Sequence, residues 1–430
     1  AFAEFFLRGS MDHDKTFFKN IEVVMPGTFL FYKNNNLKSH RYWDIKKNLK
    51  LENKKKNIKN LLNDSIKKHL ISDVKIGSFL SGGTDSSLIT SLANKRLNYK
   101  ISTFTYDFSN SENFSESERA KKIANKIGAY NKNVKINHKF ILENFDKLIK
   151  GVESPITSIR LFGTFKNYIT AKEKKIKVIL EGQGGDEIFA GYDYNYIFYF
   201  KDLIKNLTKK NAFKLFLKDK NLKINSINDL INFYITSTNQ YGSTSDGVPY
   251  INSELFNKDF LNDHLNEEFY NQKKITNSYL IDSQIRDLTE IKLPRVLKYT
   301  DRLSMMNGVE TRVPLLDNNI INYGIGLKPN YKFKNGKSRW ILKKELKLGF
   351  DFQKNKKTIV DPQNNWLKNQ LKDYVYDSIH SKSFIENDIF NSKNVHKYYL
   401  NYLNQNHETS FNLLQILSSH RFMEIFKKLN

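Results

Sequence analysis

Hydroxyl, glycine and carboxylate residues crowd together in the segment 76–88, which reads IGSFLSGGTDSSL. Gly82 and Gly83 allow the backbone to turn sharply and leave no Cβ in the way of a ligand. A helix that begins just after them presents unpaired N–H groups and a partial positive charge, which suit phosphate. Ser81 and Ser86 add hydroxyl donors. The segment therefore predicts a phosphate-binding turn between a strand and a helix.

Asp85 places a carboxylate beside this predicted anion site. A carboxylate is useful there if a metal ion bridges it to the phosphates. The segment is not the Walker A loop, because it lacks the G-x-x-x-x-G-K-[ST] pattern. A plain glycine turn with a serine and aspartate helix cap is the alternative interpretation. The apolar strand before the turn and the helix after it favour the functional one.

A second turn of similar chemistry occupies residues 181–192, EGQGGDEIFAGY. Gly182, Gly184 and Gly185 again permit close approach to a ligand, and Asp186 and Glu187 offer carboxylates to a metal. The spacing differs from the dinucleotide-binding pattern G-x-G-x-x-G. A loop whose acids cap the next helix is the simpler alternative.

The elements that must position these turns alternate between strands and helices. Strands are expected at 74–80, 100–108, 132–137 and 176–182, with helices at 53–71, 84–92, 115–127, 140–150 and 161–175. Such alternation predicts an α/β fold with a parallel sheet covered on both faces. Ligands bind beyond the carboxyl ends of such strands, where both turns and Asp107 lie. The residues from 366 to 428 are expected to be helical.

Composition narrows the function classes. The chain has 430 residues and a formal net charge of +25, but its lysines are spread along the sequence, so we expect no nucleic-acid partner. It has no cysteine, which excludes disulfides, thiolate zinc sites and a cysteine nucleophile in these residues. No apolar run reaches 18 residues, so neither a membrane partner nor a span is expected. We expect a cytoplasmic protein, and the start at Ala1 without a methionine suggests a fragment.

Four motifs occur in one order, and they carry a family resemblance. They read SGGTDSS, GQGGDEIFAGY, DRLSMMNGVETRVPLLD and KNKKTIVDPQNNWL. Together they resemble the synthetase domain of glutamine-hydrolysing asparagine synthetases and their paralogues, and the first is similar to the pyrophosphate loop of PP-loop ATP pyrophosphatases. The resemblance implies a PP-loop (adenine nucleotide α-hydrolase-like) domain with a helical C-terminal part over residues 51–430. Residues 1–50, with short strands and a turn at Asn34–Asn36, resemble the C-terminal remnant of an Ntn-type glutamine amidotransferase domain.

The family resemblance also implies a reaction. ATP and aspartate give β-aspartyl-AMP and pyrophosphate, and ammonia or glutamine nitrogen then yields asparagine and AMP. ATP and Mg²⁺ are the implied cofactors, with Asp85 and Asp186 as the metal ligands. By motif matching, nucleotide contacts fall to Ser81, Gly82, Gly83, Thr84, Asp85, Ser86, Ser87, Gly182, Gly184 and Gly185. Lys356, Gln183 and Arg339 are the implied catalytic residues, and a homodimer is compatible with the family.

Two departures from the family pattern leave open which carboxylate substrate accepts the nitrogen. Asparagine synthetases usually carry Glu where this chain has Gln183, and glutamine cannot act as a general base. Near Lys356, Thr358-Ile359 stands where the family has Gly-Phe. A paralogue that amidates another carboxylate, for example in surface-polysaccharide synthesis, is one alternative. A PP-loop enzyme acting on tRNA and a nucleotide-binding protein without catalysis are the others.

Glu310 and Arg312 allow two interpretations. They belong to the GVETRVP motif and either line the wall of the site or form a buried ion pair.

Overall fold

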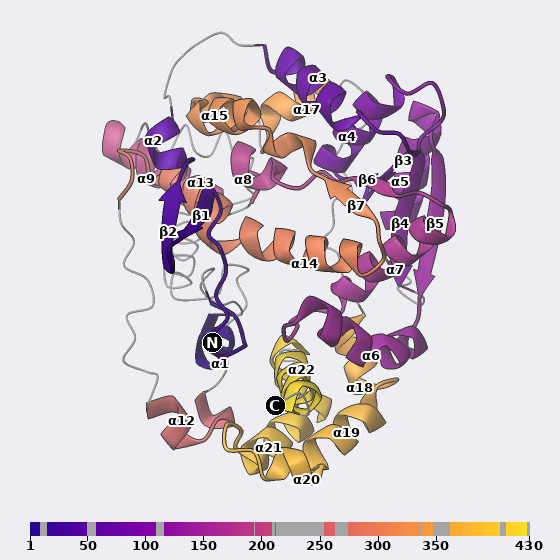
Figure 1. Cartoon of the computed structure of the whole chain (residues 1–430), viewed down its shortest axis with the longest axis vertical. Helices are drawn as coiled ribbons and strands as arrows, with labels where there is room; N and C mark the ends of the chain where they lie inside the picture. The colour runs from indigo at the N-terminus through magenta and orange to yellow at the C-terminus, as the bar shows by residue number, and fades with distance from the viewer. Residues whose placement is uncertain are drawn as a thin grey trace.

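The computed structural model describes most of the chain (Figure 1). The described residues are 1–8, 15–49, 57–108, 116–192, 194–208, 211, 253–262, 274–334, 337–346, 362–404 and 410–427.

Five parallel strands form the central sheet, in the order β5-β4-β3-β6-β7. They are β3 (Ile76–Phe79), β4 (Ser102–Phe108), β5 (Tyr130–Ile136), β6 (Val178–Leu180) and β7 (Glu310–Arg312). The first four confirm the predicted strands and the α/β class. β7 was not predicted, because its three residues Glu-Thr-Arg show no apolar alternation. It forms an edge by pairing with β6, with Leu180 opposite Arg312.

Helices cover both faces of the sheet, as the alternation predicts. Along β6, Val178 and Leu180 belong to one apolar cluster and Ile179 to the other, because successive side chains point to opposite faces. The first cluster includes α3 (Ile58–His69), α4 (Thr84–Asn94) and α5 (Glu116–Ile127). The second includes α6 (His138–Val152) and α7 (Arg160–Glu173). The five helices expected from the sequence are thus confirmed.

The C-terminal residues form a helical layer that extends the second cluster (Figure 1). Its members are α18 (Gln363–Lys368), α19 (Lys372–His380), α20 (Lys382–Ile385), α21 (Ser392–Asn404) and α22 (Ser410–Lys427), which confirms the expected helices. An unpredicted helix at the other end of the chain, α1 (Phe2–Arg8), packs here as well. Phe5 and Phe6 are buried in the same cluster, and the Gln415 side chain donates a hydrogen bond to the carbonyl of Phe5.

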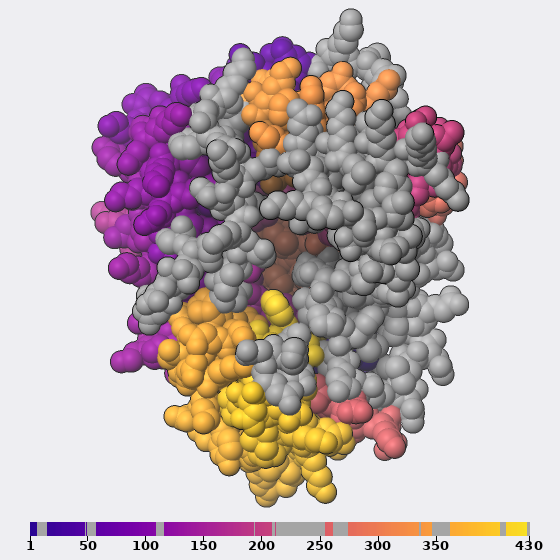
Figure 2. Space-filling view, turned by 180° about the vertical axis from the view of Figure 1, so that it is seen from behind, coloured from indigo at the N-terminus to yellow at the C-terminus, as the bar shows by residue number. Residues whose placement is uncertain are grey.

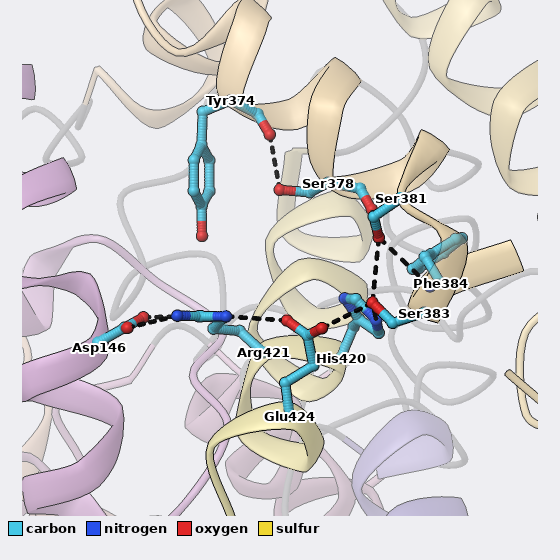
Figure 3. Close-up of polar contacts among 9 residues, drawn as sticks. All are labelled: Asp146, Tyr374, Ser378, Ser381, Ser383, Phe384, His420, Arg421 and Glu424. Atoms are coloured by element: carbon cyan, nitrogen blue, oxygen red, sulfur yellow. Dashed lines mark hydrogen bonds and ion pairs between the residues drawn. The ribbon is translucent and has the colours of Figure 1, made fainter. Parts of the chain in front are cut away.

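An ion-pair network fastens this helical layer to α6 (Figure 3). Arg421 on α22 binds both carboxylate oxygens of Asp146 on α6, at 2.7 and 2.6 Å. Its other terminal nitrogen lies 2.9 Å from Glu424, which accepts a 2.6 Å bond from the Ser383 hydroxyl on α20. The hydrogen bonds from Arg421 hold the pKa of Asp146 below its ordinary value. Three helices far apart in the sequence are thereby joined.

A two-stranded antiparallel hairpin precedes the sheet domain. β1 (Thr28–Lys33) pairs with β2 (Asn36–Arg41) through a two-residue loop, in which Asn34 and Asn35 have φ of 51° and 57°. Paired positive φ values match a type I′ turn, which asparagine tolerates. The hairpin confirms the predicted strand pair and turn. Nearly all of its residues are exposed, including Phe29, Phe31 and Tyr32.

The remaining elements complete the described chain. They are α2 (Ile45–Asn48), α8 (Gly185–Phe189), α9 (Asn195–Asn206), η2 (Ser253–Leu255), α12 (Lys258–Asn262), α13 (Tyr279–Arg286), the π-helix η3 (Asp287–Ile291), α14 (Leu293–Met305), η4 (Pro314–Leu316), α15 (Asn318–Gly326), α16 (Pro329–Lys332) and α17 (Trp340–Leu346). Seen from behind, a hollow opens between the sheet side and the C-terminal helices, and atoms in the colour of α13 and α14 lie deep in it (Figure 2). Among the described helices, none is both long and apolar enough to cross a bilayer.

Candidate active site

The turn after β3 leads into a helix N-terminus that has no side-chain cap. Gly82 has φ of +74°, and Gly83 is the N-cap of α4 without a side-chain hydrogen bond. Ser81 is exposed, and its Oγ lies 3.1 Å from Oγ of Ser86. The first turn of α4 therefore offers N–H groups together with two hydroxyls, which is a suitable cradle for phosphate.

Two of the residues expected at this turn point inward. The exposed fraction of Thr84 is 2%, and that of Ser87 is 0%. A phosphate in the turn can reach Thr84 through its backbone N–H group, because its side chain packs into the interior. The backbone N–H of Ser87 instead donates to the Gly83 carbonyl at 3.1 Å. The assignment of both residues to the nucleotide stays a prediction.

The second glycine turn packs directly against the first. A Cβ on Gly182 would lie 2.6 Å from the backbone nitrogen of Ser86, and one on Gly185 would lie 2.5 Å from the carboxylate carbon of Asp85. Gly184 has φ of +91° and is the N-cap of α8, which carries Asp186 in its first turn. The glycines expected to permit close approach to a ligand thus permit close approach of the two turns.

Arg339 joins the two turns through their carboxylates. Its Nη1 lies 2.5 Å from Oδ2 of Asp85 and 2.6 Å from Oδ1 of Asp186. The arginine is buried, at 5% exposure, and directly precedes α17 with a backbone φ of 51°. Burial opposes its charge, but Asp85 and Asp186 outweigh burial and raise the pKa of Arg339 above its ordinary value. The structure therefore brings together three residues predicted from separate motifs.

The donor set at this point fits a hard divalent cation. Asp85 and Asp186 direct oxygens at one position, which a cationic nitrogen takes, and carboxylate oxygen is the donor that Mg²⁺ prefers. In the described part of the chain, no group of three or more His, Cys, Asp or Glu side chains could hold a metal. Two carboxylates suit a metal that also takes oxygens from a nucleotide's phosphates.

Gln183 belongs to the second turn and takes part in a hydrogen-bonded group that the sequence did not reveal. Its Nε2 donates to Oε2 of Glu181 at 3.1 Å, and the Tyr168 hydroxyl donates to the other oxygen at 2.6 Å. The Tyr168 oxygen lies 2.7 Å from Oγ1 of Thr311 on β7. Burial raises the pKa of Glu181 above its ordinary value, against the effect of these hydrogen bonds.

Arg119 is a further cation at the first turn, and it too was missed. A Cβ on Gly82 would lie 3.0 Å from its Cγ, so α5 carries this side chain against the phosphate cradle. Burial lowers the pKa of Arg119, and the charge of Arg339 lowers it further. Only the folded chain puts the two arginines close together, and the sequence carried no local signal for this.

Behind the second turn, buried polar groups hold α8 in place. Gln284 on α13 donates to the backbone carbonyls of Glu187 at 2.9 Å and Ile188 at 2.7 Å. Lys332 is fully buried and donates to Gln284 at 2.6 Å and to the Ile325 carbonyl at 2.9 Å. Burial lowers the pKa of Lys332 to about 7.

The carboxylate of Glu187 has its own hydrogen-bond partner within the second turn. It accepts a hydrogen bond from the Tyr192 hydroxyl, and burial raises its pKa to about 7. The Nζ of Lys292 lies 3.9 Å from the centre of the Tyr192 ring, a cation–π contact that covers this side of the loop.

Other expected residues lie elsewhere. Lys356, with the Thr358-Ile359 departure, lies outside the described residues. Arg312 pairs with Glu310 at 2.6 Å and donates to the carbonyls of His69, the last residue of α3, and of Ile71. The two residues form an ion pair, as one interpretation expected, but the pair is not buried, because the Glu310 side chain is 57% exposed.

Asp107 confirms its place at a strand end but is engaged locally. It accepts bonds from Ser117 at 2.9 Å and Asn133 at 3.3 Å.

The comparisons with known proteins agree with this geometry. The family model described as asparagine synthase matches residues 57–424. This chain belongs to the asparagine synthase family. The match includes both glycine turns, Arg339 and the C-terminal helices, and it confirms the resemblance found in the four motifs.

Individual relatives of the asparagine synthase family match at lower identity. The chain is 28% identical to "Asparagine synthetase [glutamine-hydrolyzing] 1" of Bacillus subtilis over 74% of its own length and 51% of that protein. It is 24% identical to "Amidase chyE" of Penicillium rubens, over 86% and 64% of the two chains, and 31% identical to the Rattus norvegicus asparagine synthetase, over 43% and 38%. The matched part thus spans only about half of the Bacillus protein.

Among solved structures, a U34-tRNA thiolase from Methanococcus maripaludis aligns at 16% identity with a TM-score of 0.23. It covers 42% of this chain and 76% of the thiolase. So low a score supports no conclusion about this chain.

Proposed function

We propose that the chain is an ATP-dependent ligase that converts aspartate to asparagine through β-aspartyl-AMP. The nitrogen comes from ammonia or glutamine, and the products are AMP and pyrophosphate. We expect small-molecule substrates and a cytoplasmic location. The observation that carries the proposal is the meeting of Asp85, Asp186 and Arg339 beside an uncapped helix N-terminus.

The reaction has two displacements. In the first, an oxygen of the aspartate side chain attacks the α-phosphorus of ATP, and pyrophosphate leaves with the bonding electrons. In the second, the nitrogen of ammonia attacks the acyl carbon, a nitrogen proton is released, and AMP leaves. The first step develops negative charge on the leaving pyrophosphate, so a site for it must supply donors and cations.

The residues fit this requirement. The first turn of α4, with Ser81 and Ser86, would bind the leaving pyrophosphate through N–H and hydroxyl groups. Asp85 and Asp186 would hold Mg²⁺, which supplies charge neutralisation on the phosphates when it is bound. Arg339 and Lys356 complete the proposed set of cations.

The test measures AMP and pyrophosphate release from ATP with Mg²⁺ and ammonium, with and without aspartate. We expect aspartate-dependent release together with asparagine. Asp186→Asn should abolish both products, whereas Lys382→Ala, at an exposed pair on α20, should leave them unchanged. ATP binding without any carboxylate-dependent release of AMP would refute the ligase proposal.

A second candidate is a ligase of the same type that amidates another carboxylate. Gln183 favours it, because a carboxamide stands where asparagine synthetases usually carry Glu. The same assay with a panel of small carboxylates separates the candidates. Release that depends on another acid and not on aspartate would establish the second.

A further inference from the structure

Glu181 is a buried carboxylate for which the mechanism above gives no role. Its exposed fraction is 4%, and it directly follows β6 as the first residue of the second glycine turn. No ion pair reaches it from the described residues, and its partners are the hydroxyl of Tyr168 and the carboxamide of Gln183. A buried carboxylate without a cation is costly, so an unspecialised position would carry an apolar or neutral residue.

The hydrogen bonds around Glu181 have a fixed direction. A carboxylate only accepts hydrogen bonds, so the Tyr168 hydroxyl donates its one proton to Oε1 of Glu181. Tyr168 can then only accept from Thr311, whose hydroxyl is the donor at 2.7 Å. By the same rule the group of Gln183 that faces Glu181 is its NH₂.

This direction determines what Gln183 offers to a ligand. With Nε2 turned to Glu181, the carbonyl oxygen Oε1 points the other way, and no hydrogen bond within the described part of the chain reaches it. The residue is half-buried, and the adjacent Gly182 abuts the backbone of Ser86 in the phosphate cradle. Gln183, next to a glycine that packs against the phosphate cradle, therefore carries an acceptor oxygen that is not used by Glu181.

We propose that Glu181 is a positioning residue, which holds the Gln183 carboxamide with its oxygen toward the reactants so that it accepts from a reactant N–H group. This inference rests on the proposed ligase function and deepens it. ATP phosphates and the acceptor carboxylate carry no N–H, and the adenine amino group of ATP is separated from the phosphates by the ribose. The oxygen therefore fits either the ammonia nucleophile or an amino group of the acceptor. The Gln183 carbonyl oxygen also disfavours the binding of an oxyanion beside it, because an oxyanion needs hydrogen-bond donors.

The decisive substitution is Glu181→Gln, which preserves shape and removes the charge. The new carboxamide still accepts from Tyr168, so its NH₂ faces Gln183. Gln183 must then turn its oxygen inward and present NH₂ to the reactants. We expect the KM for the N–H reactant to rise about tenfold, the effect of one hydrogen bond, while ATP–pyrophosphate exchange at a saturating acceptor concentration changes less than twofold.

The reciprocal double variant Glu181→Gln/Gln183→Glu tests the direction of the pair. It keeps the amide–carboxylate hydrogen bond with its ends exchanged, so an acceptor oxygen again faces the reactants. We expect the KM to return to within about threefold of the parent value. The matched control is Glu173→Gln, on the exposed end of α7, which should change nothing.

Steady-state kinetics distinguish ammonia from an amino group of the acceptor as the N–H reactant. A rise in the KM for ammonium identifies the nucleophile, and a rise confined to an amino-bearing carboxylate, absent with the same acid lacking its amino group, identifies the acceptor. A Glu181→Gln variant that loses exchange and amide formation equally at saturating substrate concentrations would overturn the proposal, as would a double variant without rescue.

An activity-independent readout keeps failure of the inference distinct from failure of the ligase proposal. The side-chain NH₂ of Gln183, observed by NMR in ¹⁵N-glutamine-labelled protein and assigned with Gln183→Glu, should be protected from solvent exchange in the parent. The protection should vanish in Glu181→Gln. An unprotected NH₂ in the parent would refute the inference even if the ligase activity is found, whereas protection without any carboxylate-dependent exchange would refute the ligase alone.

Discussion

Arg339 reaches Asp186 with the same nitrogen that it directs at Asp85, at 2.6 and 2.5 Å. One guanidinium nitrogen therefore neutralises two carboxylates that come from different turns, 101 residues apart in the sequence. A metal ion at the same place would relieve the same repulsion between the two carboxylates. The arginine and the metal would therefore stabilise the folded chain in the same way.

Arg339→Ala should destabilise the fold by about 3–5 kcal/mol, because it leaves two neighbouring carboxylates without their cation. Arg339→Lys should recover part of this loss. Denaturant unfolding measures both variants. Added Mg²⁺ should raise the melting temperature of Arg339→Ala more than that of the parent, since binding to the folded state stabilises it. Equal shifts in the two proteins would argue against a shared cation position.

Gly182→Ala should weaken nucleotide binding at least tenfold, because its Cβ would lie 2.6 Å from the backbone nitrogen of Ser86 and must push the two turns apart. Gly128→Ala is the control for an added methyl group. Gly128 has φ of +74° but nothing within 4 Å, so its substitution should cost about 1 kcal/mol of stability and leave nucleotide affinity unchanged. Titration calorimetry with ATP distinguishes them.

Lys332→Met should remove a pH dependence from folding. The pKa of this lysine is about 7 in the folded chain and near 10.5 when exposed, so the unfolded state binds more protons between these values. The stability of the parent therefore rises with pH across this window, by up to about 5 kcal/mol, and falls as the pH drops toward 7.

The measurement for Lys332 is the difference in unfolding free energy between the parent and Lys332→Met at pH 7 to 10. The difference should shift steadily in favour of the parent as the pH rises. A difference that stays constant would mean that Lys332 keeps its proton throughout.

Arg421→Ala should cost about 1–2 kcal/mol, after allowance for screening of the partly exposed Asp146 and Glu424. The two-oxygen contact with Asp146 and the link to Glu424 make this pair stronger than an ordinary surface pair (Figure 3). Lys382→Ala is the matched control, since Lys382 and Glu386 lie 3.8 Å apart and are largely exposed. It should cost less than about 0.5 kcal/mol. Equal losses, measured by urea unfolding, would remove any special role for the network.

How far the sequence predicts this molecule depends on whether a feature is local. The turns around Gly82 and Gly184 are local, because glycine, hydroxyl and carboxylate residues follow strands directly, and the order of motifs shows the family. The strand at 310–312 is not local. Glu310 and Arg312 look like charged loop residues until β6 supplies a partner.

The parts of the site that were missed share a physical cause. Glu181 reads as a strand residue, and its role appears only when Tyr168 from α7 and Thr311 from β7 reach it. Arg119 belongs to a helix face that is unremarkable until α5 packs on Gly82. Arg339 was assigned by motif, but its meeting with two carboxylates is a property of packing that no local pattern encodes.

The exposed hairpin of β1 and β2 has a practical consequence. Its aromatic side chains Phe29, Phe31 and Tyr32 are 49%, 51% and 66% exposed, and a two-stranded ribbon gains little stability from its own hydrogen bonds. Unpaired strand edges bearing apolar groups are templates for pairing with other chains in concentrated solution. Aggregation of this protein during storage and crystallisation will therefore depend on hairpin residues that are not part of the proposed active site. Phe29→Lys or Phe31→Lys is the simplest change to reduce it.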